Sequence, residues 1–137
     1  MKDPIKITVL GASGRMGRML VKAVIENDGT ILVGVTEQDN HEWIGQDIGK
    51  LILGEENGLV VSNKPHDLIL KSQAIIDFTQ PDVSLFYSGL AAQARIVHVI
   101  GTTGFSKSQL RKIELAGQHA TIIRAGIAVA SIDTANP

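Results

Sequence analysis

Three regularly spaced glycines form the stretch of this sequence most suggestive of chemistry. GASGRMGR (residues 11–18) follows an apolar run and opens a helical pattern. The first amides of a helix have no internal acceptor and carry the positive end of its dipole, so a pyrophosphate binds there if no side chain blocks its approach. Gly11 permits a sharp turn, Gly14 permits close approach, and Gly17 lets the helix pack against the preceding strand. The alternative is a structural turn, because the pattern is G-x-x-G-x-x-G rather than G-x-G-x-x-G.

An acidic residue favours the nucleotide interpretation. Glu37 ends the second apolar run, 20 residues after Gly17. Dinucleotide-binding folds place a carboxylate there to accept hydrogen bonds from the adenosine ribose hydroxyls. The alternative is a solvated charge at the end of a strand. The next residue, Gln38, supplies no charge for a 2′-phosphate, although Arg15 lies within reach. We therefore expect NADH to bind at least as well as NADPH.

A second polar cluster follows two later apolar runs. IDFTQP (76–81) and VIGTTGFS (99–106) lie at the carboxyl ends of predicted strands, the edge at which open α/β sheets bind ligands. Thr102 and Thr103 stand between two glycines, so this loop offers backbone groups and two hydroxyls to a ribose or a nicotinamide ring. The alternative is a plain strand-to-helix turn in which Ser106 caps the helix.

Alternating strands and helices must position these residues. Apolar runs predict strands at 5–10, 30–37, 73–79, 95–101 and 120–126. The first helix is predicted directly after the glycine loop, with Gly29 as its C-cap, and a short helix is predicted near 65–72. Two further helices are predicted to begin at capping boxes, one formed by Thr79 and Asp82 and the other by Ser106 and Gln109. The segment 38–58 is typical of a long surface loop with room for one short helix. Nearly continuous apolar strands indicate a parallel sheet covered on both faces, so the predicted fold is a doubly wound, Rossmann-like α/β domain.

Composition narrows the function classes. The net charge of −1 argues against bulk attraction to nucleic acid or anionic membranes. The absence of cysteine excludes disulfides and thiolate chemistry. No apolar run approaches the roughly 20 residues that span a bilayer, and the first residues lack the apolar centre of a signal peptide. We therefore expect a cytoplasmic protein.

The histidines and the tryptophan predict no further site. His98 lies in an apolar strand, where a packed, hydrogen-bonded role is expected. His41, His66 and His119 are predicted at the surface, and their spacing indicates no metal site. Trp43 is predicted to anchor its loop.

The motifs together resemble the dihydrodipicolinate reductase family. GASGRMGR, IDFTQP and VIGTTGFS, in this order and spacing, are similar to its N-terminal half, and IGQDIGKLIL (44–53) resembles a loop of that half. The resemblance covers residues 5–126. It implies NAD(P)H-dependent reduction to tetrahydrodipicolinate in lysine and diaminopimelate biosynthesis. It further implies that the chain binds NAD(H) and/or NADP(H). The pyrophosphate would be held by Gly11, Ala12, Ser13, Gly14, Arg15 and Met16, and the adenosine ribose by Glu37. The nicotinamide end would be held by Gly101, Thr102 and Thr103, with Phe78 and Thr79 nearby.

The resemblance ends near residue 126. In the family, a segment like A-P-N-F-S-x-G-V-N leads into a second domain that carries the substrate site, with paired histidines, a lysine general acid and a glycine-threonine loop. Here RAGIAVASIDTANP (124–137) stands instead, with Ile127 in place of an asparagine. We therefore expect a nucleotide-binding domain at 1–126, a divergent or truncated tail at 127–137, no second domain and no catalytic residue. The family forms tetramers through its second domain, so the oligomeric state stays open.

Three interpretations remain at this stage. The chain is the cofactor-binding half of a reductase that needs a second domain to meet its substrate, a stand-alone nucleotide-sensing module, or an α/β protein whose glycine loop is structural. Turnover by the purified chain would contradict the first interpretation. A melting temperature that millimolar NADH leaves unchanged would favour the third.

Overall fold

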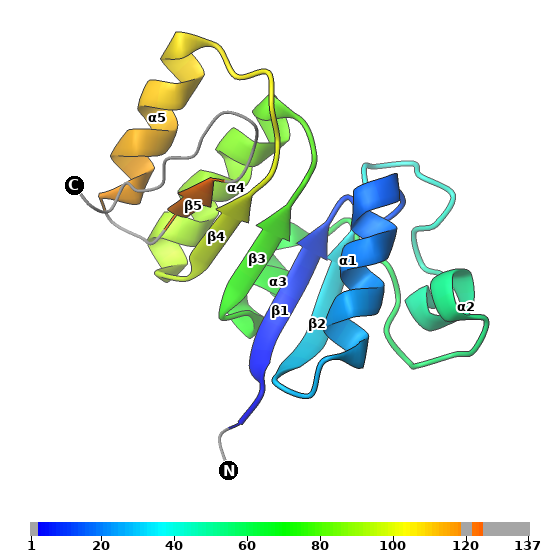
Figure 1. Cartoon of the computed structure of the whole chain (residues 1–137). Coiled ribbons are helices and arrows are strands. Elements are labelled where there is room, and N and C mark those ends of the chain that lie inside the picture. Colours follow the sequence, from blue (N-terminus) through cyan, green and yellow to red (C-terminus); the bar gives the residue numbers. More distant parts are fainter. Residues whose placement is uncertain (1–2, 119–121, 125–137) are drawn as a thin grey trace. The chain divides into compact units, whose positions relative to one another are not determined.

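The computed structural model describes residues 3–118 and 122–124. Contacts divide the chain into two compact units, residues 1–73 and 74–137 (Figure 1). The predicted tail at 127–137, His119 and the ends of the last predicted strand lie outside the described residues. No helix in the described ranges is both long and apolar enough to cross a membrane.

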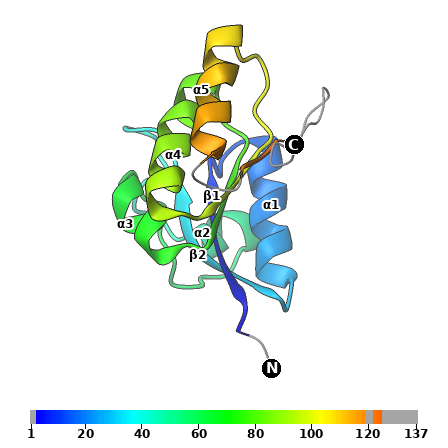
Figure 2. The ribbon, with the colours of Figure 1, turned by 90° about the vertical axis from the view of Figure 1, so that its left-hand side faces the viewer.

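The first unit is built on two parallel strands. It contains β1 (Ile5–Leu10), α1 (Arg15–Glu26), β2 (Thr30–Thr36), α2 (Ile48–Leu53) and α3 (Pro65–Lys71). β1 pairs with β2 in parallel. α1 and α3 both pack on these strands, and they cover opposite faces of the pair (Figures 1 and 2). Both faces of the strand pair are therefore covered by helices.

The second unit repeats the alternation. It contains β3 (Ala74–Asp77), α4 (Pro81–Ala94), β4 (Val97–Ile100), α5 (Lys107–Gly117) and β5 (Ile122–Arg124). β3 pairs with β4 and β4 with β5, all in parallel. The core cluster comprises Ile100, Ile113 and Ile122, with Leu85, Phe105 and Ala116 packed against it. The predicted Rossmann-like fold of parallel strands joined by helices is confirmed.

Polar loops follow the carboxyl ends of four strands. The glycine loop follows β1, Glu37 follows β2, residues 78–80 follow β3, and residues 101–106 follow β4. Within each unit, the candidate residues therefore follow the carboxyl ends of strands, as the sequence predicted.

Two predicted helix boundaries are wrong, and a competing polar contact explains each. The C-cap of α1 is Asn27 rather than Gly29, because the Asn27 side chain accepts from the Gly29 amide at 2.7 Å and turns the chain earlier. Thr79 caps nothing. The N-cap of α4 is Gln80, followed by Pro81, and the Thr79 hydroxyl donates to Asp77 at 2.6 Å.

The capping box at the start of α5 is confirmed. The Ser106 hydroxyl accepts from the Gln109 amide at 3.1 Å, and the Gln109 side chain accepts from the Ser106 amide at 2.8 Å. These two reciprocal bonds fix where the loop after β4 ends and α5 begins.

The loop after β2 returns to the strand that precedes it. Asp47 caps α2, and its carboxylate also accepts from the amides of Asn57 and Gly58 at 3.0 and 2.8 Å. Further on, the backbone amide of Ser62 donates to the carbonyl of Val35 at 3.0 Å, and the backbone carbonyl of Ser62 accepts from the Glu37 amide at 3.2 Å. These bonds fix the backbone at Glu37 as it leaves β2.

Candidate functional site

Two glycines of the first loop are required by the fold. Gly11 has a φ of +74°, which other residues rarely adopt. Its amide and that of Ala12 donate to the Thr36 carbonyl at 3.1 and 3.2 Å. At Gly17, a Cβ would lie 2.9 Å from the Ala12 Cα and would overlap the Gly11 carbonyl. The close packing of α1 on the loop therefore excludes any side chain at Gly17.

Gly14 has no such structural reason to be glycine. It is the N-cap of α1, with φ −68° and ψ 165°, a conformation open to every residue. A Cβ would meet only the Gly11 carbonyl oxygen, at an ordinary contact distance of 3.7 Å. No side chain caps α1. Within residues 3–118 and 122–124, the first-turn amides of Arg15, Met16 and Gly17 have no described acceptor.

The structure brings Glu37 to the glycine loop. Its Oε2 accepts from the Ser13 amide at 2.6 Å, and the side chain is only 5% exposed. Its Oε1 accepts from the Gln38 amide at 3.3 Å and lies 4.0 Å from Nε2 of His41. One carboxylate oxygen thus holds the loop, and the other lies beside the Gln38 amide and the His41 ring.

Three residues that the sequence did not assign to a site form a chain of contacts from Glu37 back to the glycine loop: His41, Trp43 and Arg18. Nδ1 of His41 accepts from the Trp43 amide at 3.0 Å, so in the neutral ring the proton lies on Nε2, toward Glu37. The Arg18 guanidinium lies 4.9 Å from the Trp43 ring centre, and its Nε donates to the Ser13 carbonyl at 2.9 Å. The predicted anchoring role of Trp43 is confirmed, since it is 8% exposed. The sequence could not predict that these residues lie close together, because Arg18 in α1 is far along the chain from the loop at 38–43.

In the second loop the two threonines have different environments. The Thr102 hydroxyl accepts from the Thr79 amide at 3.0 Å and from the Ser84 hydroxyl at 2.8 Å, and it donates toward Asp77 Oδ1 at 3.3 Å. It is buried, whereas Thr103 is exposed. The hydroxyl of Thr102 is therefore saturated within the protein, and only Thr103 offers its hydroxyl to a ligand.

Gly101 is fixed by an aromatic ring. Its amide donates to the Asp77 carbonyl at 2.7 Å. A Cβ at this position would overlap the Phe78 ring. The ring thus packs directly on the backbone of Gly101, which holds the start of the loop.

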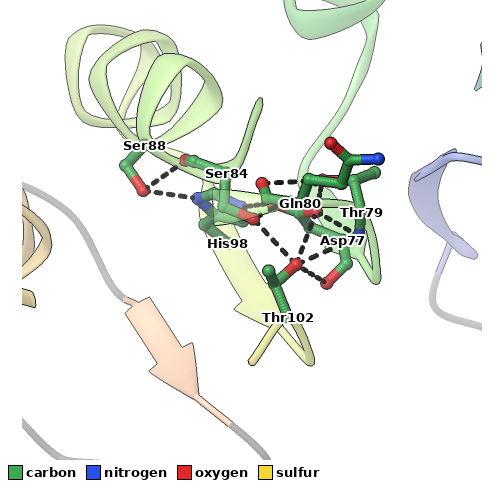
Figure 3. Close-up of polar contacts among 7 residues, drawn as sticks. All are labelled: Asp77, Thr79, Gln80, Ser84, Ser88, His98 and Thr102. Carbon is green, nitrogen blue, oxygen red and sulfur yellow. Dashed lines mark hydrogen bonds and ion pairs between the residues drawn. The ribbon is translucent and has the colours of Figure 1, made fainter. Parts of the chain in front are cut away.

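A fully buried carboxylate organises the second loop (Figure 3). Asp77 and His98 are both 0% exposed, and Asp77 Oδ2 accepts from Nε2 of His98 at 2.8 Å. Nδ1 of His98 lies 3.2 Å from the Ser88 hydroxyl. The predicted packed, hydrogen-bonded role of His98 is confirmed. Burial raises the pKa of Asp77, but the hydrogen bond and charge of His98, with the Thr79 hydroxyl, outweigh it and hold the pKa below its ordinary value.

The candidate residues thus form two sets, each organised within its own unit. The first set comprises the glycine loop and Glu37, and the second comprises residues 101–103 with Asp77 and Thr79 behind them. Of the remaining histidines, His66 is exposed, as predicted, and His41 is half-buried beside Glu37.

A family comparison decides where this chain belongs. The family model described as "Dihydrodipicolinate reductase, N-terminus" matches residues 5–126. The chain belongs to this family. It is 50% identical over 126 residues to the 4-hydroxy-tetrahydrodipicolinate reductase of Dinoroseobacter shibae, covering 92% of this chain and 47% of the relative. It is 48% identical over 120 residues to the enzyme of the same name from Ruegeria pomeroyi, covering 88% of this chain and 45% of the relative.

A solved structure supports the fold. The dihydrodipicolinate reductase of Paenisporosarcina sp. TG-14, solved with dipicolinate bound, matches with a TM-score of 0.70 at 24% identity, over 90% of this chain and 47% of that one. The chain therefore has the fold of the N-terminal part of that reductase. It spans about half the length of the curated relatives that it matches.

The buried carboxylate makes stability depend on pH. Because the pKa of Asp77 lies below its ordinary value of 3.8 in the folded chain, the unfolded chain binds the proton more readily. The stabilisation is present above about pH 4 and is lost as the pH falls through the folded-state pKa. We expect the melting temperature of the wild type to fall more steeply than that of Asp77→Asn between about pH 5 and pH 2.5, measured by circular dichroism. Parallel curves would contradict this.

Proposed function

We propose that this chain binds a nicotinamide dinucleotide, NAD(H) and/or NADP(H), as the cofactor-binding half of a dihydrodipicolinate reductase. One observation carries the proposal: α1 begins at an uncapped N-terminus, and Gly14 stands there without any packing or conformational need for glycine. An anion that approaches the first-turn amides closely explains the glycine, because a side chain would occupy its place.

The assignment of residues follows from the two local geometries and the family resemblance. The pyrophosphate lies on the loop of Gly11, Ala12, Ser13, Gly14, Arg15 and Met16, with the amides of Arg15 and Met16 as donors. Oε1 of Glu37 accepts from the adenosine ribose, since Oε2 is bonded to Ser13. Gly101, Thr102 and Thr103 serve the nicotinamide end, Thr102 through its backbone and Thr103 also through its hydroxyl. In this proposal, residues 1–126 make up the nucleotide-binding domain.

The chain's own contribution to the reaction is binding and orientation. The bound cofactor supplies a hydride. The helix N-terminus neutralises part of the pyrophosphate charge, and the buried carboxylate of Glu37 fixes the adenosine ribose. In the whole protein the reaction is reduction to tetrahydrodipicolinate in lysine and diaminopimelate biosynthesis, in the cytoplasm. The substrate site belongs to the second domain of the family, so the chain by itself binds cofactor without turnover.

A comparison of two glycines tests the cradle. Gly14→Ala places its methyl group where the phosphate approaches, yet it meets no protein atom closer than 3.7 Å. We expect NADH affinity to fall by at least about tenfold, with a melting temperature within about 2 °C of wild type. Gly17→Ala forces α1 off the loop and is expected to cost about 1–3 kcal/mol of stability. Isothermal titration calorimetry and thermal unfolding measure the two effects.

Gly89→Ala is the matched control for these variants. Gly89 lies exposed in α4, and its Cβ would meet nothing within 4 Å. This variant should bind NADH as the wild type does. A Gly14→Ala variant that also binds NADH with unchanged affinity would refute the cradle and leave a structural turn.

Cofactor preference is a second test. Glu37 places a buried negative charge beside the adenosine ribose, Gln38 adds no positive charge, and Arg18 is held by Ser13 and Trp43. We expect NADH to bind at least as tightly as NADPH. Glu37→Gln keeps an acceptor for the Ser13 amide but removes the charge, so the affinity for NADPH should rise relative to that for NADH. Wild-type affinity ten times tighter for NADPH would contradict the expectation.

Turnover is a third test. The purified chain, supplied with NADH and the cyclic imine dicarboxylate substrate, should give no loss of nicotinamide absorbance above the background rate. A full-length reductase of the family provides the positive control in the same assay. Turnover by the chain alone would overturn the proposed division between cofactor binding and catalysis.

A further inference from the structure

We propose that the buried pair of Asp77 and His98 is a positioning device for the second loop, so that these two residues act at the nicotinamide end without touching the cofactor. The inference rests on the proposed function, and it assigns to His98 a task beyond packing. All the atoms involved belong to the second unit (Figure 3).

The first step is the fixed orientation of the carboxylate. Oδ2 of Asp77 can only accept, so Nε2 of His98 carries the proton in their 2.8 Å bond. Without this donor, Oδ2 would lie unsatisfied in a site with no exposure to water, a state that costs far more than an ordinary lost hydrogen bond. The carboxylate would then rotate or take up a proton.

The second step is the transfer of this orientation to the loops. The other oxygen, Oδ1, accepts from the Thr79 hydroxyl at 2.6 Å, from the Thr79 amide at 3.1 Å and from the Thr102 hydroxyl at 3.3 Å. The Asp77 carbonyl additionally accepts from the Gly101 amide at 2.7 Å. A rotation of the carboxylate therefore removes contacts to the loop after β3 and to the loop after β4 at the same time.

The third step is the saturation of Thr102. Its hydroxyl receives hydrogen bonds from the Thr79 amide and from Ser84, and donates its own proton toward Asp77. A hydroxyl used in this way anchors the backbone instead of contacting a ligand. The exposed Thr103, one residue later, is thus presented from a fixed point.

Ser84 of α4 provides a test whose control is Gly89 of the same helix. Ser84 is buried, at 0% exposure, and its hydroxyl donates to Thr102. Gly89 is exposed, and a Cβ there would meet nothing within 4 Å. Alanine is favourable within a helix, so both variants should fold. We expect Ser84→Ala to weaken NADH binding about threefold and Gly89→Ala to leave it unchanged.

Two amide variants test His98 itself. The longer His98→Gln side chain can place its amide nitrogen where Nε2 lies and donate to Asp77, whereas His98→Asn stops near the position of Nδ1. We expect His98→Asn to weaken NADH binding about tenfold and His98→Gln to restore it. ADP, which lacks the nicotinamide half, should bind all variants within about twofold of wild type. A purely structural role of His98 would lower melting temperature without changing the ratio of the two affinities.

The outcomes separate the inference from the function on which it rests. A wild type that binds neither ADP nor NADH would refute the proposed function itself. A wild type that binds both, with an NADH-to-ADP ratio equal in His98→Asn, Ser84→Ala and the controls, would refute the positioning role alone. Parallel losses of ADP and NADH binding in these variants would also refute it. If His98→Asn does not unfold cooperatively, the comparison of Ser84→Ala with Gly89→Ala decides.

Discussion

The hydrogen bond from the Ser13 amide to Glu37 is the contact on which the first candidate site depends. It ties the loop after β1 to the residue after β2 at 2.6 Å. The amides of Gly11 and Ala12 are bound to the Thr36 carbonyl in the same way. Every one of these loop donors is therefore used within the protein. In the part of the chain that the structure describes, the amides without an acceptor begin only at the first turn of α1. Because Thr36 and Glu37 at the end of β2 accept from the loop amides, only the first-turn amides of α1 remain to bind an anion.

The second unit repeats this construction with other residues. There too a carboxylate at the end of one strand holds the loop that follows another: Asp77 closes β3 and fixes Thr102 after β4. The difference is burial. The Glu37 side chain is 5% exposed, whereas Asp77 is fully enclosed and needs His98 as a donor. A buried carboxylate without that donor would be costly, so Asp77 and His98 are best understood as one group.

Sequence periodicity predicted the strands and most helices because parallel strands are apolar on both faces and need no other information. It also predicted the position of Glu37 and the cap at Ser106. Periodicity gave the wrong prediction where a side chain could form either of two hydrogen bonds. The hydroxyl of Thr79 binds a carboxylate two residues earlier instead of capping α4, and that carboxylate is anchored by His98, 21 residues away along the chain. Spacing cannot reveal a contact that depends on register between strands and on which face of a helix turns inward.

The glycines show why a motif alone left two interpretations open. Gly11 is explained by its positive φ and Gly17 by the approach of α1, so a structural turn accounts for both. Gly14 satisfies neither condition, since its backbone is extended and its missing side chain would meet no crowded atom. Backbone conformation and packing therefore account for Gly11 and Gly17 but not for Gly14, which lies at the start of a helix that no side chain caps. A purely structural turn offers for Gly14 only the general preference of N-cap positions for small or polar residues, whereas a bound phosphate accounts for the missing side chain directly.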